Sequence, residues 1–174
     1  LNEVATLEKL RHPAIITFVG AVRLPGHYSI VTEYCAYGNL WTALQQHAPA
    51  FSYALKLKAL LNCAQGMTFL HTSGILHRDL KPENLLMVSL LAETPIVCKL
   101  TDFGTTRDVS TSHERAWRRR LTQGVGTPTF MAPEVLDHGE YTQSADVYSF
   151  AMLAFQVYLA RDPYDTAHFK SPYD

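Results

Sequence analysis

The strongest constraint on the fold is the segment from Ala145 to Tyr158, where apolar residues occupy every side of a helix. A helix that is apolar all round is normally buried inside a larger structure, so this pattern predicts a fully buried helix. The sequence ends soon afterwards, at Asp174. We therefore expect the further helices that would cover this one to lie outside the chain.

The rest of the chain carries a mixture of helical and strand patterns. Apolar residues at every third position up to Leu10 predict an amphipathic helix that stops before His12-Pro13. Residues 105–127, rich in Ser, Thr and Arg, predict a long loop. The other predicted elements are a hairpin of Ile15 to Leu24 and Tyr28 to Glu33, a short helix capped by Asn39, a helix over about residues 52–73, and strands at Leu85 to Val88 and Val97 to Thr101.

Composition excludes several classes of function. With 174 residues, 47% of them apolar and 18% charged, the chain has the balance of one soluble globular domain. A net charge of -1 gives no general attraction to nucleic acid or to an anionic membrane. Three separated cysteines favour a reducing, cytoplasmic location over disulfides or a zinc site. No apolar run is long enough to span a bilayer, and the first residues do not resemble a signal peptide.

Three motifs occur in a fixed order and carry the chemistry. They are His77-Arg78-Asp79-Leu80-Lys81-Pro82-Glu83-Asn84, Asp102-Phe103-Gly104 and Ala132-Pro133-Glu134. Phosphoryl transfer needs a group that orients the attacking hydroxyl, positive charge near the phosphates, and oxygen ligands for the metal ion. Asp79 and Lys81 are the candidate catalytic residues for the first two tasks, whereas Asn84 and Asp102 are candidate magnesium ligands.

Together these motifs resemble the protein kinase superfamily of the serine/threonine type, most closely the tyrosine-kinase-like group. The resemblance extends from the C-helix to the F-helix of that family. It implies an α+β bilobal fold, incomplete here, with a partial small β lobe and a mainly helical large lobe. We expect residues 1–34 to belong to the N-lobe, residues 35–38 to form the hinge, and residues 39–174 to form an incomplete C-lobe. ATP and Mg²⁺ are the implied cofactors.

The resemblance gives roles to further residues of the nucleotide site. Glu3 matches the C-helix glutamate that pairs with a phosphate-binding lysine, although a solvated helix charge is the alternative. Thr32 matches the gatekeeper position. Glu33 and Cys35 lie in the hinge, where backbone groups would bind adenine, so Glu3, Glu33, Cys35, Asn84 and Asp102 are the expected cofactor-binding residues.

The same comparison implies contacts around the catalytic loop. Asp146 matches a buried F-helix carboxylate, for which the main-chain N–H groups around His77 and Arg78 are the expected donors, since an unpaired buried carboxylate is costly. Thr127 is expected to contact Asp79 and Lys81. Leu7, Phe18, His77 and Phe103 match a hydrophobic spine, although ordinary core residues would have the same apolar character.

Regulation by phosphorylation is a further expectation. The candidate acceptors are Ser110, Thr111, Ser112 and Thr122. Arg78 could bind a phosphate on one of them. Thr122 is the best candidate because Arg118-Arg119-Arg120 precedes it, although these arginines could equally be a solvated run.

The predicted function is ATP-dependent phosphorylation of Ser and Thr hydroxyls on protein substrates in signal transduction, with a possible upstream activating kinase. The isolated chain lacks the glycine-rich loop and the strand lysine of the family, so we expect it to be inactive alone. The alternative is a truncated kinase-like module that binds partners without catalysis. A glycine-rich strand pair upstream of Leu1 would favour the enzyme.

Overall fold

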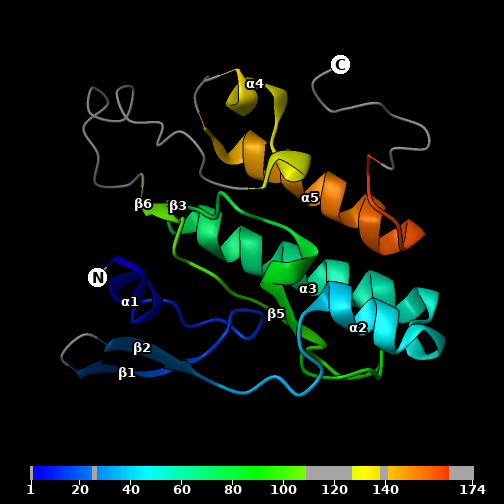
Figure 1. Ribbon diagram of the computed structural model, residues 1–174, viewed down its shortest axis with the longest axis horizontal. Coiled ribbons are helices and arrows are strands. Elements are labelled where there is room, and N and C mark those ends of the chain that lie inside the picture. Colours follow the sequence, from blue (N-terminus) through cyan, green and yellow to red (C-terminus); the bar gives the residue numbers. More distant parts are fainter. Residues whose placement is uncertain (1, 25–26, 109–126, 138–140, 165–174) are drawn as a thin grey trace.

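The computed structural model describes residues 2–24, 27–108, 127–137 and 141–164. Two long helices, α3 (Tyr53–Thr72) and α5 (Gln143–Leu159), pack against each other in the larger part of the molecule (Figure 1). The ammonium group of Lys56 on α3 donates to the carbonyl oxygen of Tyr158 on α5 at 3.0 Å. The smaller part holds helix α1 (Asn2–Leu7) and a two-stranded sheet.

The two-stranded sheet is the predicted hairpin, but it is shorter than the sequence pattern indicated. Strands β1 (Phe18–Leu24) and β2 (His27–Thr32) are antiparallel, with an irregularity in register between Phe18 and Gly20. The prediction that the first strand starts at Ile15 is wrong. Ile15 instead forms a parallel bridge to Leu100, and the adjacent Ile16 N–H donates to the Leu100 carbonyl oxygen at 2.9 Å.

Helix α1 ends before the predicted boundary. The apolar spacing continues to Leu10, but the helix stops at Leu7. Leu7 and Leu10 are nevertheless both buried, at 2% and 3% exposure. The apolar pattern therefore reports burial correctly and overstates the helix length.

Side-chain caps fix the starts of the next two helices. In α2 (Leu40–Gln46), the Asn39 side chain accepts the Thr42 N–H at 2.8 Å, as the sequence predicted. A 3-10 turn, η1 (Ala48–Ala50), then leads to α3, where the Ser52 hydroxyl accepts the Leu55 N–H at 3.2 Å. Both helices lie close to the predicted ranges.

Two small antiparallel sheets lie between α3 and α5 in sequence. The predicted strands β4 (Leu85–Met87) and β5 (Cys98–Leu100) pair with each other and are confirmed. The pairing of β3 (Ile75–Leu76) with β6 (Arg107–Asp108) was not predicted. Arg107–Asp108 therefore does not belong to the predicted loop, and residues 109–126 lie outside the described part of the chain.

Helix α5 is buried on one face and exposed on the other. It follows the 3-10 turn η4 (Pro128–Phe130) and the short helix α4 (Pro133–Leu136). One face packs against α3 and η4, with Leu153 and Val157 completely buried. On the opposite face Val147 is 60% and Phe155 40% exposed. Complete burial was expected only with further covering helices, so the exposed apolar face does not contradict the pattern, and complete burial stays a prediction.

One hydrophobic core spans both parts of the molecule. Its members come from α1, the segment around Ile15, α2, α3, both small sheets and α5. The predicted α+β class is confirmed. The division into residues 1–34, 35–38 and 39–174 stays a prediction. Within the described residues, every helix is too short or too polar to cross a membrane.

Candidate active site

The segment from His77 to Asn84 forms a loop between two small sheets. It begins directly after β3 and ends in the 3-10 turn η2 (Pro82–Asn84), which continues into β4. Leu80 is completely buried. Nδ2 of Asn84 donates to the carbonyl oxygen of Asp79 at 2.7 Å. The loop is therefore closed on itself, and its polar side chains are brought together.

Asp146 on α5 holds this loop in place. Its Oδ1 accepts the main-chain N–H of Arg78 at 2.9 Å, and its Oδ2 accepts that of His77 at 3.0 Å. These main-chain partners confirm the prediction. Nε2 of His71 lies 2.9 Å from Oδ2, and the Tyr141 hydroxyl donates to Oδ1 at 2.8 Å. The last two partners were not predicted, because no sequence spacing relates His71 or Tyr141 to this carboxylate.

The carboxylate of Asp146 stabilises an unfavourable backbone conformation. Asp146 is 1% exposed. Burial alone raises its pKa, but hydrogen bonds from His71, Arg78 and His77 outweigh this effect and hold the pKa below its ordinary value. Arg78 has a φ of 72°, in the left-handed region that non-glycine residues rarely adopt. The hydrogen bond from the Arg78 N–H to Asp146 helps to keep the loop in this shape.

A pocket of about 170 Å³ lies between α3 and α5. Its lining includes His71 and Asp146, with apolar side chains such as Met67 and Phe150 around them. The pocket therefore borders the carboxylate that holds the loop. It does not include the polar side chains of the loop itself.

Asp79 lies at the centre of a polar cluster that draws on two distant segments. Its Oδ2 accepts from Nζ of Lys81 at 2.8 Å and from Nδ2 of Asn84 at 3.1 Å. The Thr127 hydroxyl donates to Oδ1 at 3.0 Å and accepts from Lys81 at 2.8 Å. Thr127 thus makes both contacts predicted for it. The structure brings together the candidate catalytic residues Asp79 and Lys81 with the candidate metal ligand Asn84.

Asp79 carries a negative charge at neutral pH. It is 9% exposed. Burial alone raises its pKa, but Lys81, with further hydrogen bonds from Thr127 and Asn84, lowers the pKa by more than burial raises it. An ionised carboxylate is a hydrogen-bond acceptor. The side chain is therefore suited to orient a donor such as a hydroxyl group.

Asn84 and Asp102 lie at the same end of the β4–β5 pair. Thr101, the residue before Asp102, donates its main-chain N–H to the carbonyl oxygen of Asn84 at 2.9 Å. The side-chain hydrogen bonds described for Asn84 both use its nitrogen, so its amide oxygen is the atom suited to a cation. Asp102 is exposed and, like Arg78, has a positive φ, of 63°. An amide oxygen and a carboxylate fit the preference of Mg²⁺ for hard oxygen ligands. Within the described residues, no group of three or more His, Cys, Asp or Glu side chains could hold a metal ion.

Phe103 packs beside the loop from His77 to Asn84. It is 1% exposed, and its ring centroid lies 5.7 Å from that of the fully buried His77. Burial lowers the pKa of His77, which is therefore neutral at neutral pH. The Thr105 hydroxyl donates to the His77 carbonyl oxygen at 3.0 Å. Two of the four predicted spine residues are thus in contact, and the complete spine stays a prediction.

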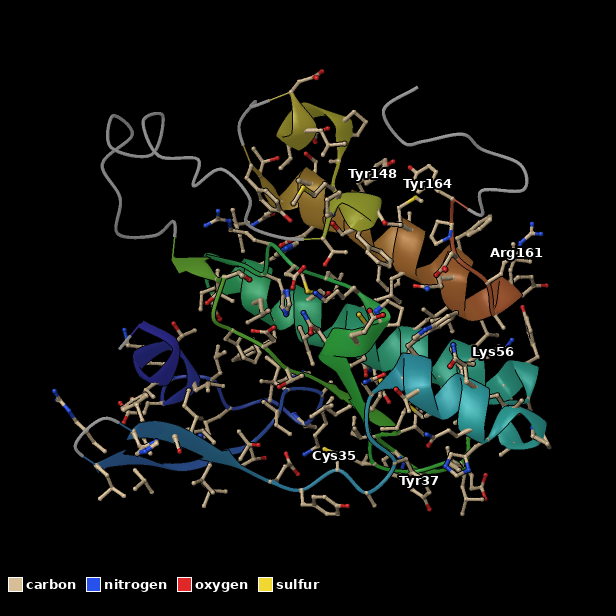
Figure 2. All side chains as sticks on the ribbon, viewed as in Figure 1. Cys35, Tyr37, Lys56, Tyr148, Arg161 and Tyr164 are labelled. Atoms are coloured by element: carbon tan, nitrogen blue, oxygen red, sulfur yellow. The ribbon has the colours of Figure 1, made fainter. Side chains whose placement is uncertain are left out.

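The connection from β2 to α2 carries the predicted hinge. Figure 2 shows Cys35 and Tyr37 along this connection. The Tyr37 N–H donates to the carbonyl oxygen of Met87 on β4 at 3.3 Å. Cys35 is 8% exposed, and burial raises the pKa of its thiol. The side chain of Glu33 binds Lys99 and the main chain of Thr17, a role that was not predicted.

Some predicted site residues cannot be placed. Glu3 lies on α1, but its side chain is outside the described part of the structure. The predicted phosphorylation sites between residues 110 and 122 and the arginines at 118–120 also fall outside it. Their roles stay predictions. The guanidinium of Arg78, the expected phosphate ligand, lies 5.7 Å from the centre of the Tyr141 ring.

Comparisons with known proteins agree with this arrangement. The family described as "Protein kinase domain" matches residues 1–173. The probable serine/threonine-protein kinase gdt2 of Dictyostelium discoideum is 37% identical over 163 residues, which cover 94% of this chain and 10% of that protein. A putative serine/threonine-protein kinase/receptor of Acanthamoeba polyphaga mimivirus is 37% identical over 170 residues, which cover 97% of this chain and 10% of that protein. Serine/threonine-protein kinase STY46 of Arabidopsis thaliana is 34% identical over 164 residues, which cover 94% of this chain and 27% of that protein.

The fold and the polar loop define a partial protein kinase fold, and the predicted fold class is confirmed. The chain belongs to the protein kinase family, and these relatives are of the serine/threonine type. It spans about a tenth to a quarter of the length of these relatives.

Proposed function

We propose that the protein containing this chain transfers the γ-phosphoryl group of ATP to Ser or Thr hydroxyls of protein substrates in signal transduction. The observation that carries this proposal is the cluster of Asp79, Lys81 and Thr127, beside Asn84 and Asp102. These groups match the needs of phosphoryl transfer, which depends mainly on positioning and on electrostatic stabilisation. The names of the relatives support Ser and Thr as acceptors.

In this mechanism Asp79 orients the attacking hydroxyl. The substrate oxygen forms a bond to the γ-phosphorus while the bond to the ADP oxygen breaks, and the hydroxyl proton passes to the Asp79 carboxylate. Lys81 is held 2.8 Å from Asp79 and offsets negative charge that develops on the transferred group. Thr127 keeps both side chains in this orientation through its two hydrogen bonds.

The metal and nucleotide would be held by residues on both sides of the cluster. Asn84 and Asp102 would bind Mg²⁺, and their oxygen donors fit this ion. Bound Mg²⁺ would neutralise phosphate charge. The main chain from Glu33 to Cys35 would bind the adenine base, while Glu3 would help to hold the phosphates through a lysine from outside this chain.

The remaining expectations concern partners, location and regulation. We propose a cytoplasmic protein that is activated by an upstream kinase at Thr122, with Arg78 as a phosphate ligand. Thr122→Ala in the full-length protein is expected to lower activity and to increase cleavage of residues 109–126 by trypsin. Unchanged activity and unchanged cleavage would count against this regulation.

The proposed activity is tested by phosphoryl transfer from radiolabelled Mg-ATP to a generic basic protein, followed by phosphoamino-acid analysis. The full-length protein is expected to label Ser and Thr. Asp79→Asn should lower kcat by at least about a hundredfold, because the variant loses both the charge and the proton acceptor. Glu93→Gln, which removes an exposed charge in the turn between β4 and β5, is the matched control and should retain full activity.

Equal activity of wild type and Asp79→Asn would remove Asp79 from this role. A folded full-length protein that transfers no phosphate but still binds protein partners would support the alternative of a noncatalytic kinase-like module. Labelling of Tyr alone would contradict the proposed acceptor class.

A further inference from the structure

The side chain of Glu33 joins three segments that are far apart in sequence. Glu33 follows β2 directly, at the start of the connection to α2. Its Oε1 accepts the main-chain N–H of Thr17 at 2.7 Å and the ammonium group of Lys99 on β5 at 2.6 Å. The main-chain N–H of Glu33 donates in turn to the Thr17 carbonyl oxygen at 3.0 Å. We call Thr17, Glu33 and Lys99 the hinge clamp.

The hinge clamp lies where the small hairpin meets the rest of the molecule. Ile16, next to Thr17, donates its main-chain N–H to Leu100 at 2.9 Å, and Leu100 follows Lys99 on β5. The main chain therefore joins the entry to β1 with β5. Lys99 adds a second connection to β5, because its side chain binds Glu33 at the end of β2.

The surroundings of the clamp make its ion pair stronger than an ordinary surface pair. The side chains of Lys99 and Glu33 are only 16% and 28% exposed. Fully exposed pairs contribute little because water and salt screen them, whereas hydrogen bonds between charged groups are short and strong when sheltered. Burial alone raises the pKa of Glu33, but Lys99 and Thr17 lower it by more, so the carboxylate is ionised at neutral pH.

We propose that Lys99 is a positioning residue for nucleotide binding: by holding the Glu33 side chain, it fixes the main chain from Glu33 to Cys35 in the orientation that binds the base. This inference rests on the proposed function, in which that main chain binds adenine. Lys99 itself acts only through Glu33. The same strand leads to Asp102, so one element carries both the clamp and the candidate metal ligand.

Steady-state kinetics of the full-length protein test this role. Lys99→Met should raise the KM for ATP about threefold to tenfold and change kcat by less than about twofold, because the residue affects base binding and not the reacting atoms. Lys99→Arg keeps the charge and should restore at least half of the lost affinity. Lys58→Met, which removes a lysine of α3 outside the clamp, should leave KM unchanged.

A double-mutant cycle tests whether Lys99 acts through Glu33. In a Glu33→Gln background, Lys99→Met is expected to raise the KM for ATP by less than about twofold further, because the two residues share one interaction. Independent, multiplicative effects on KM would overturn the proposed route. A Lys99→Met variant with unchanged KM and a raised kcat would also overturn it, since the clamp would then restrain the enzyme.

Amide hydrogen exchange separates this inference from the proposed activity. Lys99→Met should speed exchange at the Thr17 amide about threefold or more, whether or not the protein turns over ATP, because Glu33 loses its second partner. Unchanged exchange would reject the clamp and leave the kinase proposal intact. A wild-type protein without ATP binding would reject the kinase proposal, and with it the nucleotide role of Lys99.

Discussion

The hydroxyl of Thr127 donates a hydrogen bond to Oδ1 of Asp79 at 3.0 Å. The two residues are 48 positions apart, and one lies in the loop after β3 while the other immediately precedes η4. Thr127 also accepts a hydrogen bond from Lys81, so a single hydroxyl bridges the cation and the carboxylate. The segment before the Ala-Pro-Glu motif therefore completes the polar cluster.

Removal of this hydroxyl should impair the proposed reaction more than it impairs folding. Thr127→Val keeps the shape of the side chain but leaves Asp79 and Lys81 without their bridge, and it should lower kcat about tenfold or more, since a hydrogen bond to a charged group contributes about 1.5–3 kcal/mol. Thr127→Ser retains the hydroxyl and should keep most activity. Equal kcat values for the Val and Ser variants would contradict this bridging role.

The Asp146 carboxylate should make stability depend on acidity. Its pKa in the folded state lies below the ordinary 3.8, so its contribution is fully present above that value and is lost as the pH falls through the folded pKa. Asp146→Asn should lower the free energy of unfolding by about 3 kcal/mol at pH 7, since it weakens several buried hydrogen bonds. Urea titrations at pH values from 7 to 3 should show that the difference in free energy of unfolding between wild type and Asp146→Asn shrinks below about pH 4. If this difference in free energy of unfolding stayed constant with pH, the lower stability of the variant would come from altered packing and not from the lost charge.

Gly38 and Gly20 should respond differently to the same substitution. Gly38 has a φ of 65°, where a side chain is strained, whereas the space around both glycines is open. Gly38→Ala should therefore lower the free energy of unfolding by about 1 kcal/mol through backbone strain alone. Gly20→Ala is the matched control and should change it by less than about half of that. Equal losses measured by thermal unfolding would contradict the strain argument.

The three cysteines should differ in their reaction with iodoacetamide. Cys63 and Cys98 are completely buried, and burial raises the pKa of Cys98 to about 12. Cys35 is 8% exposed, so it should be the first to be alkylated at pH 8 in the folded protein. Mass spectrometry of timed samples gives the order, and protein unfolded in urea supplies the unprotected rates. Earlier labelling of Cys63 or Cys98 would show that the core opens locally.

The candidate metal ligands predict a defined dependence on Mg²⁺. Asp102→Asn replaces a carboxylate by a neutral amide and should raise the Mg²⁺ concentration needed for half-maximal phosphate transfer about tenfold or more. Asp137→Asn alters an exposed carboxylate after α4 and should leave this concentration unchanged. An unaltered Mg²⁺ requirement in Asp102→Asn would remove Asp102 from the metal site.

The sequence predicted the elements that carry their own local signals. Asn39 was recognised as a helix cap because its side chain acts within one turn, and the strands around Leu86 and Lys99 follow from their apolar runs. The main-chain donors to Asp146 and the contacts of Thr127 were predicted from the family resemblance. In each case the residue types and their order along the chain were sufficient to predict the element or the contact.

Long-range contacts without a motif were missed. The pairing of β3 with β6 involves two residues in each strand, too few for a periodic pattern. The His71 contact to Asp146 depends on how α3 meets α5, and the pairing of Lys99 with Glu33 depends on how β5 meets the hairpin. Such contacts follow from tertiary packing, which the spacing of residues along one segment does not encode.

The dependence of the His77 to Asn84 loop on Asp146 affects how shortened gene products should be interpreted. A transcript that stops between residues 85 and 145 would still encode every letter of the His77 to Asn84 motif. Its product would lack the Asp146 carboxylate, which accepts hydrogen bonds from the main-chain N–H groups of His77 and Arg78. A motif search would score such a product as a kinase, although the backbone shape that gives the motif its chemistry is supplied by a helix encoded further downstream.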